Sequence, residues 1–313
     1  MKKDKILKLG LGILLSASIA SCENDSAQNQ ELSEALVPEK IISLDKAVRE
    51  YNNFYNTRIA PFEGKTSSEQ IRAVWFDTKT LENYLNNVNS LAKQQNIHIT
   101  GISFILTANE ENQRDIIIAP LAKHPETNAN MPFSIDNNKV IFIDDNAFDA
   151  YSNLADYNAL TDVAQSLLLS IDGNVSLATA IKNYNSYYDL YVEPLSNMVK
   201  NDSRFCFYEG NLFRNYLNYI KKQAKENKVD LNGVNIVYGV YDNSPALGEY
   251  ANHQTLFLTP SITNGKSVFS LTKEAGFSFD FETNIIELSS LKSEDISSSS
   301  LSNEMGSSPP IGI

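Results

Sequence analysis

The histidines and cysteines, whose side chains suit acid–base, nucleophilic and metal chemistry, are few and lie far apart in the sequence. The chain of 313 residues has three histidines, His98, His124 and His253, and two cysteines, Cys22 and Cys206. No two histidines stand at the spacing that places metal ligands on one helix face, and an HExxH motif is absent. The Gly-x-Ser-x-Gly motif and the Walker loop are absent as well. Motifs therefore assign no catalytic residue, no metal and no cofactor.

Two alternatives concern His253. It stands in one segment with Asp242 and Glu249, which could form a metal or acid–base cluster, although a solvated loop accounts for the same residues. It could also serve as the base for a Cys206 nucleophile. Cys206, however, lies between two aromatic residues in an expected strand, where a small buried hydrophobic side chain is the simpler interpretation. A thiol in such surroundings should resist ionisation.

A group of aspartates in the middle of the chain has the number, but not the arrangement, of a calcium site. The group consists of Asp136, Asp144, Asp145 and Asp149. It lacks the glycine and the ligand spacing of an EF-hand loop. The sequence therefore predicts no calcium site there.

The elements that must position these residues occur twice. Residues 72–109 match residues 204–241 at an offset of 132, with eight identities in 38 pairs and no gap. Residues 43–61 match residues 176–194 at an offset of 133, with seven identities in 19 pairs. The period is far longer than the roughly 20–50 residues of solenoid repeats. We therefore expect two copies of a small domain, the second with an insertion between Tyr241 and Thr255.

Each copy predicts a helix, a short strand, a second helix and three further strands. In the first copy we expect them at residues 44–61, 73–76, 81–92, 97–106, 116–118 and 140–143. Pro61 and Pro194 mark the ends of the first helices, and Asp77 or Thr78 can cap the second helix of the first copy. The predicted fold is α+β, with two similar repeats, each a mostly antiparallel sheet with helices packed on one face.

The alternation of apolar residues changes parity inside one strand of each copy. The change falls at Thr100–Gly101 in the first copy and at Asn232–Gly233 in the second. A parity change requires an extra residue in the strand, and glycine can adopt positive φ at such a place. We therefore expect a bulge or turn at both positions.

Several polar residues recur in both copies. They are Asn52/Asn185, Arg72/Arg204, Asp77/Glu209, Asn83/Asn215, Asn86/Asn218 and Lys93/Lys225. Asparagine inside a helix indicates a fixed hydrogen bond, because its side chain otherwise competes for backbone groups. The functional alternative is that Asn83 and Asn215 line equivalent ligand sites. Tyrosines of the second copy raise a similar choice between a sugar-binding platform and core packing: Tyr187, Tyr191, Tyr219 and Tyr238.

The N-terminus carries the most specific motif. Four lysines within the first eight residues precede an apolar stretch, Leu9–Ala20, that is too short to span a bilayer stably. It ends in Ile19-Ala20-Ser21-Cys22, which resembles the lipobox of bacterial lipoproteins. The resemblance implies cleavage before Cys22 and acylation of that residue, and several acyl chains anchor a protein stably. An ordinary secretory signal with an incidental cysteine is the alternative.

Charge narrows the choice of partners. The formal net charge is −12, and removal of the first 21 residues takes away four lysines and one aspartate, which makes it −15. This acidity argues against nucleic acid or anionic lipid as an electrostatic partner. With Cys22 acylated, no disulfide can form within the chain.

The chain is thus expected to have six parts. They are a signal peptide (1–21), a flexible tether (22–41), repeat one (42–144), a helical connector (145–174), repeat two (175–288) and a disordered tail (289–313). The whole pattern resembles duplicated lipoproteins of flavobacteria. This resemblance implies no particular activity for the chain.

Two classes of function remain. The first is an outer-membrane lipoprotein of the cell envelope, on its periplasmic or surface face, that binds a protein or glycan partner. The second is a cell-envelope hydrolase with an unrecognised site. The duplication favours the first, because no nucleophile–base pair is present in both copies.

Overall fold

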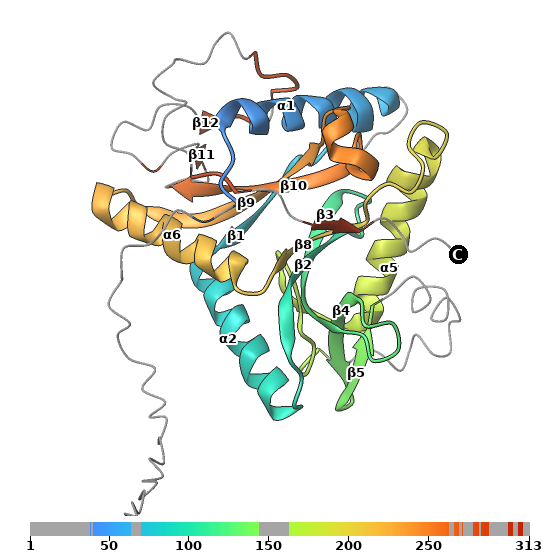
Figure 1. Ribbon diagram of the computed structural model, residues 1–313, viewed down its shortest axis with the longest axis vertical. Helices are drawn as coiled ribbons and strands as arrows, with labels where there is room; N and C mark the ends of the chain where they lie inside the picture. The colour runs from blue at the N-terminus through green and yellow to red at the C-terminus, as the bar shows by residue number, and fades with distance from the viewer. Residues whose placement is uncertain are drawn as a thin grey trace, which may run out of the picture. The chain divides into compact units, whose positions relative to one another are not determined.

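The fold is known from a computed structural model (Figure 1). It describes residues 38, 40–63, 70–143, 163–262, 266–268, 271, 278–281, 283–287, 300–302 and 306–308. The signal peptide and Cys22 lie outside these residues, as does the tether except for its last positions. Among the helices that are described, none combines the length and the hydrophobicity needed to cross a bilayer.

The helices and strands recur in the same order along the two matching segments. The first segment contains α1 (Leu44–Phe54), η1 (Tyr55–Ile59), η2 (Ala60–Phe62), β1 (Ala73–Asp77), α2 (Thr78–Gln94), β2 (Ile99–Ala108), β3 (Arg114–Lys123), β4 (Asn130–Asp136) and β5 (Lys139–Phe142). The second contains α5 (Leu177–Tyr187), η3 (Tyr188–Val192), η4 (Glu193–Leu195), β8 (Phe205–Glu209), α6 (Leu212–Asn227), β9 (Leu231–Val240), η5 (Pro245–Tyr250), β10 (Gln254–Ile262), β11 (Lys266–Val268) and β12 (Ser278–Phe279). The α+β class is confirmed. That the two segments share one three-dimensional fold stays a prediction.

Local signals set several of these boundaries. The Asp77 side chain accepts a hydrogen bond from the Thr80 amide at 2.9 Å and caps α2, as expected. Helices α1 and α5 each continue through a π-helical turn into a short 3-10 turn that contains Pro61 or Pro194. Strand β4 was not expected from the sequence.

The two segments exchange their first strands. One sheet has the order β1-β9-β10-β11-β12, and the other has the order β13-β8-β2-β3-β4-β5, where β13 is Gly306–Ser308. Thus β1 of the first segment pairs with β9 of the second, while β8 of the second pairs with β2 of the first. Ala73 of β1 lies opposite Val237 of β9. The residues that match these two in the other segment, Phe205 of β8 and Ile105 of β2, also lie opposite each other, so the two registers are the same. Neither segment alone therefore contains a complete sheet.

The expected bulges are confirmed, but the role expected of their glycines is wrong. Thr100 is an extra residue between Ile99, opposite Ala122, and Gly101, opposite Leu121. The second segment repeats this irregularity between Leu231 and Gly233. Neither Gly101 nor Gly233 has a positive φ. A Cβ atom on Gly101 would instead collide with the exchanged strand, at 2.2 Å from the Tyr208 carbonyl oxygen.

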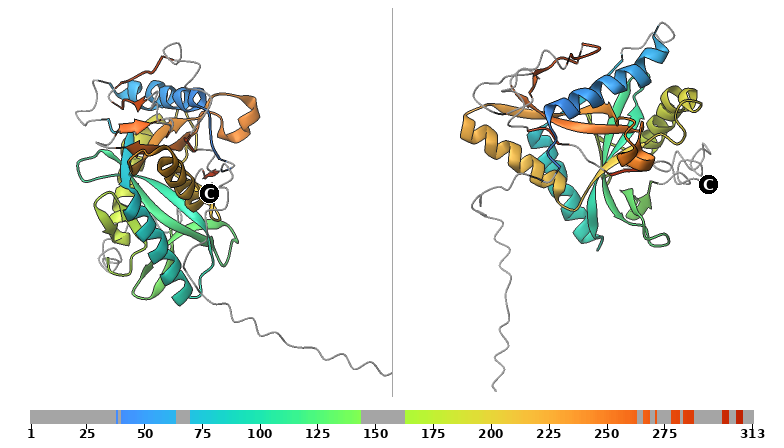
Figure 2. Two further views of the ribbon diagram at one scale, coloured as in Figure 1. Left: turned by 90° about the vertical axis from the view of Figure 1, so that its left-hand side faces the viewer. Right: turned by 45° about the horizontal axis from the view of Figure 1, so that its top comes forward.

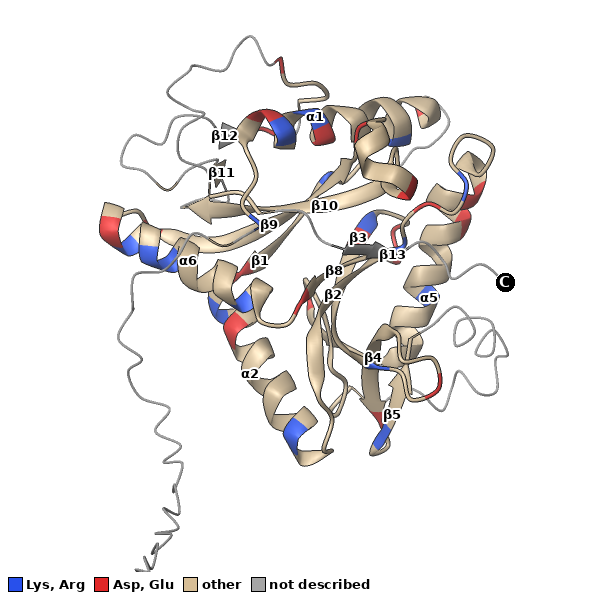
Figure 3. Cartoon of the chain, in the orientation of Figure 1, with Lys and Arg blue, Asp and Glu red and all other residues tan. Residues whose placement is uncertain are grey.

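Helices cover both faces of each sheet, whereas the sequence analysis expected helices on one face. Helix α1 packs on Val237 and Phe257 of the first sheet, and α5 packs on Ile105 and Ile117 of the second. The opposite faces of both sheets share one central core with α2 and α6 (Figure 2). The two inner helices adjoin (Figure 3). Lys221 of α6 forms an ion pair with Glu82 of α2.

Two segments between and after the repeats differ from expectation. Residues 145–162 lie outside the described part, but residues 163–174 are not helical. They lead into a hairpin of β6 (Leu168–Ser170) and β7 (Gly173–Val175), with β6 paired to β3.

The tail is ordered at two places, so its expected disorder is wrong there. Leu301 is buried in the core beneath α1, and Ser302 exchanges backbone hydrogen bonds with Leu258 at 2.7 and 3.1 Å. Strand β13 pairs with β8. The polar composition hid this order because backbone groups, rather than apolar side chains, make most of these contacts.

Candidate functional site

Cys206 is a core residue and not an exposed nucleophile. It lies on β8 in the central core, fully buried. Burial raises the pKa of its thiol far above the ordinary value. The interpretation of Cys206 as a small buried hydrophobic residue is confirmed.

The three histidines lie in separate environments. His253 lies at the base of the insertion, where its backbone carbonyl accepts a hydrogen bond from the Tyr241 amide at 3.1 Å. His124 Nδ1 accepts from the backbone amides of Glu126 and Thr127 in a turn, and His98 lies at an open hollow near Glu209. The carboxylate of Asp242 caps Ser244, and Glu249 is exposed. Among the described residues, no group of three or more histidines, cysteines or acids could hold a metal ion.

The other residues raised by the sequence have structural positions. Asp136 is buried and accepts from the Asn137 side chain at 2.8 Å, whereas Asp144, Asp145 and Asp149 lie outside the described residues. The tyrosines of the second copy are buried, which confirms core packing: Tyr187, Tyr191, Tyr219 and Tyr238. Asn83 and Asn215 are exposed on their helices, and neither lines a described hollow.

Two of the recurring polar residues, Arg72 and Asn52, bind the backbone of residues 283–286. The Arg72 guanidinium lies 3.5 Å from the centre of the Tyr51 ring and donates to the carbonyls of Thr283 and Asn284, each at 2.8 Å. Asn52 exchanges two hydrogen bonds with the backbone of Ile286. The structural interpretation of these two recurring residues is therefore confirmed.

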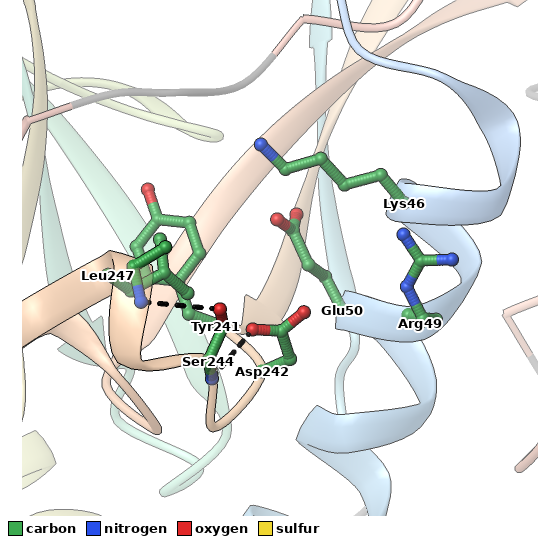
Figure 4. A pocket seen from close by; sticks show the side chains of 8 residues that line it. Lys46, Arg49, Glu50, Tyr241, Asp242, Ser244 and Leu247 are labelled. Atoms are coloured by element: carbon green, nitrogen blue, oxygen red, sulfur yellow. Dashed lines mark hydrogen bonds between the residues drawn. The ribbon is translucent and has the colours of Figure 1, made fainter.

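A small hollow lies between α1 and the insertion. Figure 4 shows Lys46, Arg49 and Glu50 of α1 facing Tyr241 and Asp242. The hollow has a volume of about 220 Å³, and Glu50 within it is 3% exposed. Basic and acidic side chains are balanced there, so the hollow has no preference for a ligand of one sign.

A second groove, larger than the hollow at α1, runs beside β1. It has a volume of about 520 Å³, within the roughly 300–1,000 Å³ of ligand sites. Its walls are Ile71 and β1, the turn joining β2 to β3, the turn joining β6 to β7, and the first part of α5. Two large apolar residues on its rim are unusually exposed, Trp75 at 36% and Ile171 at 53%.

This groove is acidic. Glu110, Glu111, Asp115 and Asp172 line it, with Arg114 as the one basic lining residue among those described. The Arg114 guanidinium is engaged in the interior, since it donates to the Arg58 carbonyl at 2.8 Å and lies 3.9 Å from the Tyr191 ring centre. The groove thus presents carboxylates to a ligand.

The acidity of one groove residue, Asp115, is altered by its surroundings. Burial, reinforced by the charge of Asp172, raises its pKa to about 6, although a hydrogen bond from the Ile116 amide opposes the shift. The groove could not be predicted from the sequence, because its walls come from four separate stretches of chain. The only tryptophan of the chain was the one available signal.

Comparison of the chain with protein-family models, with curated proteins and with solved structures found no match.

Proposed function

We propose that this protein is a lipid-anchored binding protein of the bacterial cell envelope that engages a partner through the groove beside β1. The acidic groove with its exposed apolar rim is the observation that supports this function. Exposed Trp75 and Ile171 offer apolar contact area, and the carboxylates of Glu111 and Asp172 offer charge. Aromatic anchors combined with charged rims are typical of protein interfaces.

Membrane attachment through Cys22 completes the proposal. The lipobox supports acylation of this residue, and the protein would then belong to the outer membrane. About 20 residues separate Cys22 from Ile41, where the backbone contacts the described structure by pairing with Ser302. The polar composition of this stretch predicts a flexible tether, and one of that length would span about 25 Å.

Replacement of Cys22 with serine tests the anchor. The Cys22→Ser chain should be soluble in the envelope or accumulate as an uncleaved precursor, while the wild type requires detergent for release. If the Cys22→Ser chain still requires detergent, the anchor is wrong.

The alternative, an envelope hydrolase, has one observation in its favour. Asp115 and Asp172 line the same groove, and the raised pKa of Asp115 suits a general acid. Asp115→Asn would abolish hydrolysis under this alternative. Partner binding at the groove would be weakened but not abolished by the same substitution under the first proposal, because Glu111 and Asp172 keep their carboxylates.

A further inference from the structure

We propose that the outer edge of β1 binds an extended, lysine- or arginine-bearing segment of a partner protein as an additional antiparallel strand. This inference rests on the binding function proposed above and names its site and mode. It follows from the backbone of β1, from its counterpart β8, and from the charge of the groove.

The backbone of β1 presents to the groove an edge that no described strand pairs with. Tyr238 of β9 donates to the Arg72 carbonyl at 3.0 Å, so this pair is of the hydrogen-bonded type. Such pairs alternate along an antiparallel ladder. The amides and carbonyls of Ala73 and Trp75 therefore point away from β9, towards the groove that both residues line. Within the described part of the chain, no strand pairs with this edge.

The counterpart strand shows that such an edge accepts another strand. Leu106 of β2 donates to the Arg204 carbonyl at 2.9 Å, so Phe205 and Phe207 of β8 point outwards as Ala73 and Trp75 do. Strand β13 pairs with these outward residues, placing Ser308 opposite Phe205 and Gly306 opposite Phe207. Since the exchange registers of β1 and β8 are the same, the edge of β1 has the geometry that β8 uses.

The course of the chain explains why, among the described strands, β1 has no equivalent of β13. Ser302 pairs with Leu258, and the chain then continues to β13. At the matching place in the first segment, Leu169 pairs with Ile118, but the chain turns back at Ile171 into β7. This turn forms the opposite wall of the groove. None of the described residues supplies a strand for this edge, and the proposal therefore assigns the added strand to another molecule.

The charge of the groove selects the class of partner. Alternate side chains of an added strand would face the walls that carry Glu111, Asp115 and Asp172. A second copy of this chain could offer its own Gly306–Ser308, but that strand has no basic side chain. A lysine- or arginine-bearing segment complements the carboxylates, whereas an acidic one is repelled.

The probe is a short synthetic peptide of alternating lysine and valine, compared with one in which glutamate replaces lysine. The full chain is used in detergent, and fluorescence of its single tryptophan, Trp75, reports on β1 directly. We expect the lysine peptide to bind and to slow hydrogen exchange at the Ala73 and Trp75 amides. The glutamate peptide should bind at least about tenfold more weakly.

Two substitutions locate the binding. Ala73→Pro removes an outward amide of β1 and should abolish binding, whereas Phe205→Pro, the matched change on β8, should leave it intact. Because proline could unfold β1, Asp172→Lys at an exposed turn is the second variant, and it should weaken binding at least about tenfold.

The proposal is overturned if the lysine peptide does not bind, if both peptides bind equally, or if binding leaves the two amides unprotected. Protection of β1 by self-association without peptide would assign the edge to a second copy. If the lysine peptide does not bind but a photoreactive probe at Ile171 crosslinks to a partner protein, strand addition is rejected and the proposed binding function is retained.

Discussion

Gly101 lies so close to Tyr208 that a Cβ atom on the glycine would be 2.2 Å from the tyrosine's carbonyl oxygen. Gly101 belongs to the first matching segment and Tyr208 to the second. Gly233 has the same relation to Phe76, whose carbonyl oxygen would be 2.7 Å from an added Cβ atom. The strand pairing thus explains why both matching segments carry a glycine here, because in each sheet the strand from the other segment passes over a bulge that leaves no room for a side chain.

The first prediction concerns these glycines. Gly101→Ala should lower the free energy of unfolding by about 1–3 kcal/mol or more, because the colliding atom belongs to the backbone. Gly233→Ala should cost less, since its nearest neighbour is the partly exposed Trp75 side chain. Urea unfolding measures both values.

Gly239→Ala is the control for this series. It lies on the same strand as Gly233, its added carbon would be 3.2 Å from the nearest atom, and the first segment carries Thr107 at the matching place. Its cost should stay below about 1 kcal/mol. Equal costs for Gly101→Ala and Gly239→Ala would contradict the close approach.

A second prediction follows from the exchange itself. If the chain is divided between Ile143 and Val163 and the halves are produced separately, neither should fold alone, because each lacks a strand of its sheet and part of the central core. Mixing the halves should restore the circular dichroism spectrum and a single complex in gel filtration. A half that unfolds cooperatively by itself would show that the segments are independent domains.

The third prediction uses the acidity of Asp115. Its folded pKa of about 6 lies above the ordinary value of 3.8, so the folded protein binds this proton more tightly than the unfolded chain. Stability from the protonated carboxyl is present below about pH 4 and is lost as the pH rises through 6. Asp115→Asn should therefore be more stable than the wild type by about 1–3 kcal/mol above pH 6, and the two should agree near pH 4. A difference that is the same at every pH would contradict the burial of an ionised carboxylate.

A fourth prediction separates binding from thiol chemistry. Replacing Cys206 and His253 together with alanine should leave partner binding unchanged, because the thiol is buried and neither residue lines the groove. Circular dichroism confirms folding of the double variant. Loss of a biological activity in a folded variant that still binds its partner would favour an enzyme.

The local fold could be predicted from the sequence, whereas the pairing of its strands could not. Apolar periodicity identified α1, α2, β1, β2 and their counterparts, and the parity change located both bulges. The two matching segments are too similar for their sequences to predict which strand pairs with which. Strands β1 and β8 have similar patterns and identical registers, so either could pair with β2 or with β9. Periodicity specifies which face of a strand is buried, and not which copy supplies its neighbour.

The groove was hidden for a related reason. The groove forms where β1, paired with β9, lies near the turns and the helix α5 of the other sheet. Its lining residues include Trp75, Glu111, Asp172 and Asn183. None of them forms a motif with its neighbours in sequence. The tail was misjudged because its serines contribute backbone pairing, which composition does not report.

Site-specific photo-crosslinking in intact cells tests the central claim most directly. A photoreactive amino acid at Ile171, on the groove, is compared with one at Met198, which is more exposed at 64% but does not line the groove. We predict a crosslink from Ile171 alone, mapped by mass spectrometry to an extended segment of a partner that carries lysine or arginine. Equal crosslinking from Met198, or no crosslink from Ile171, would contradict binding at the groove beside β1.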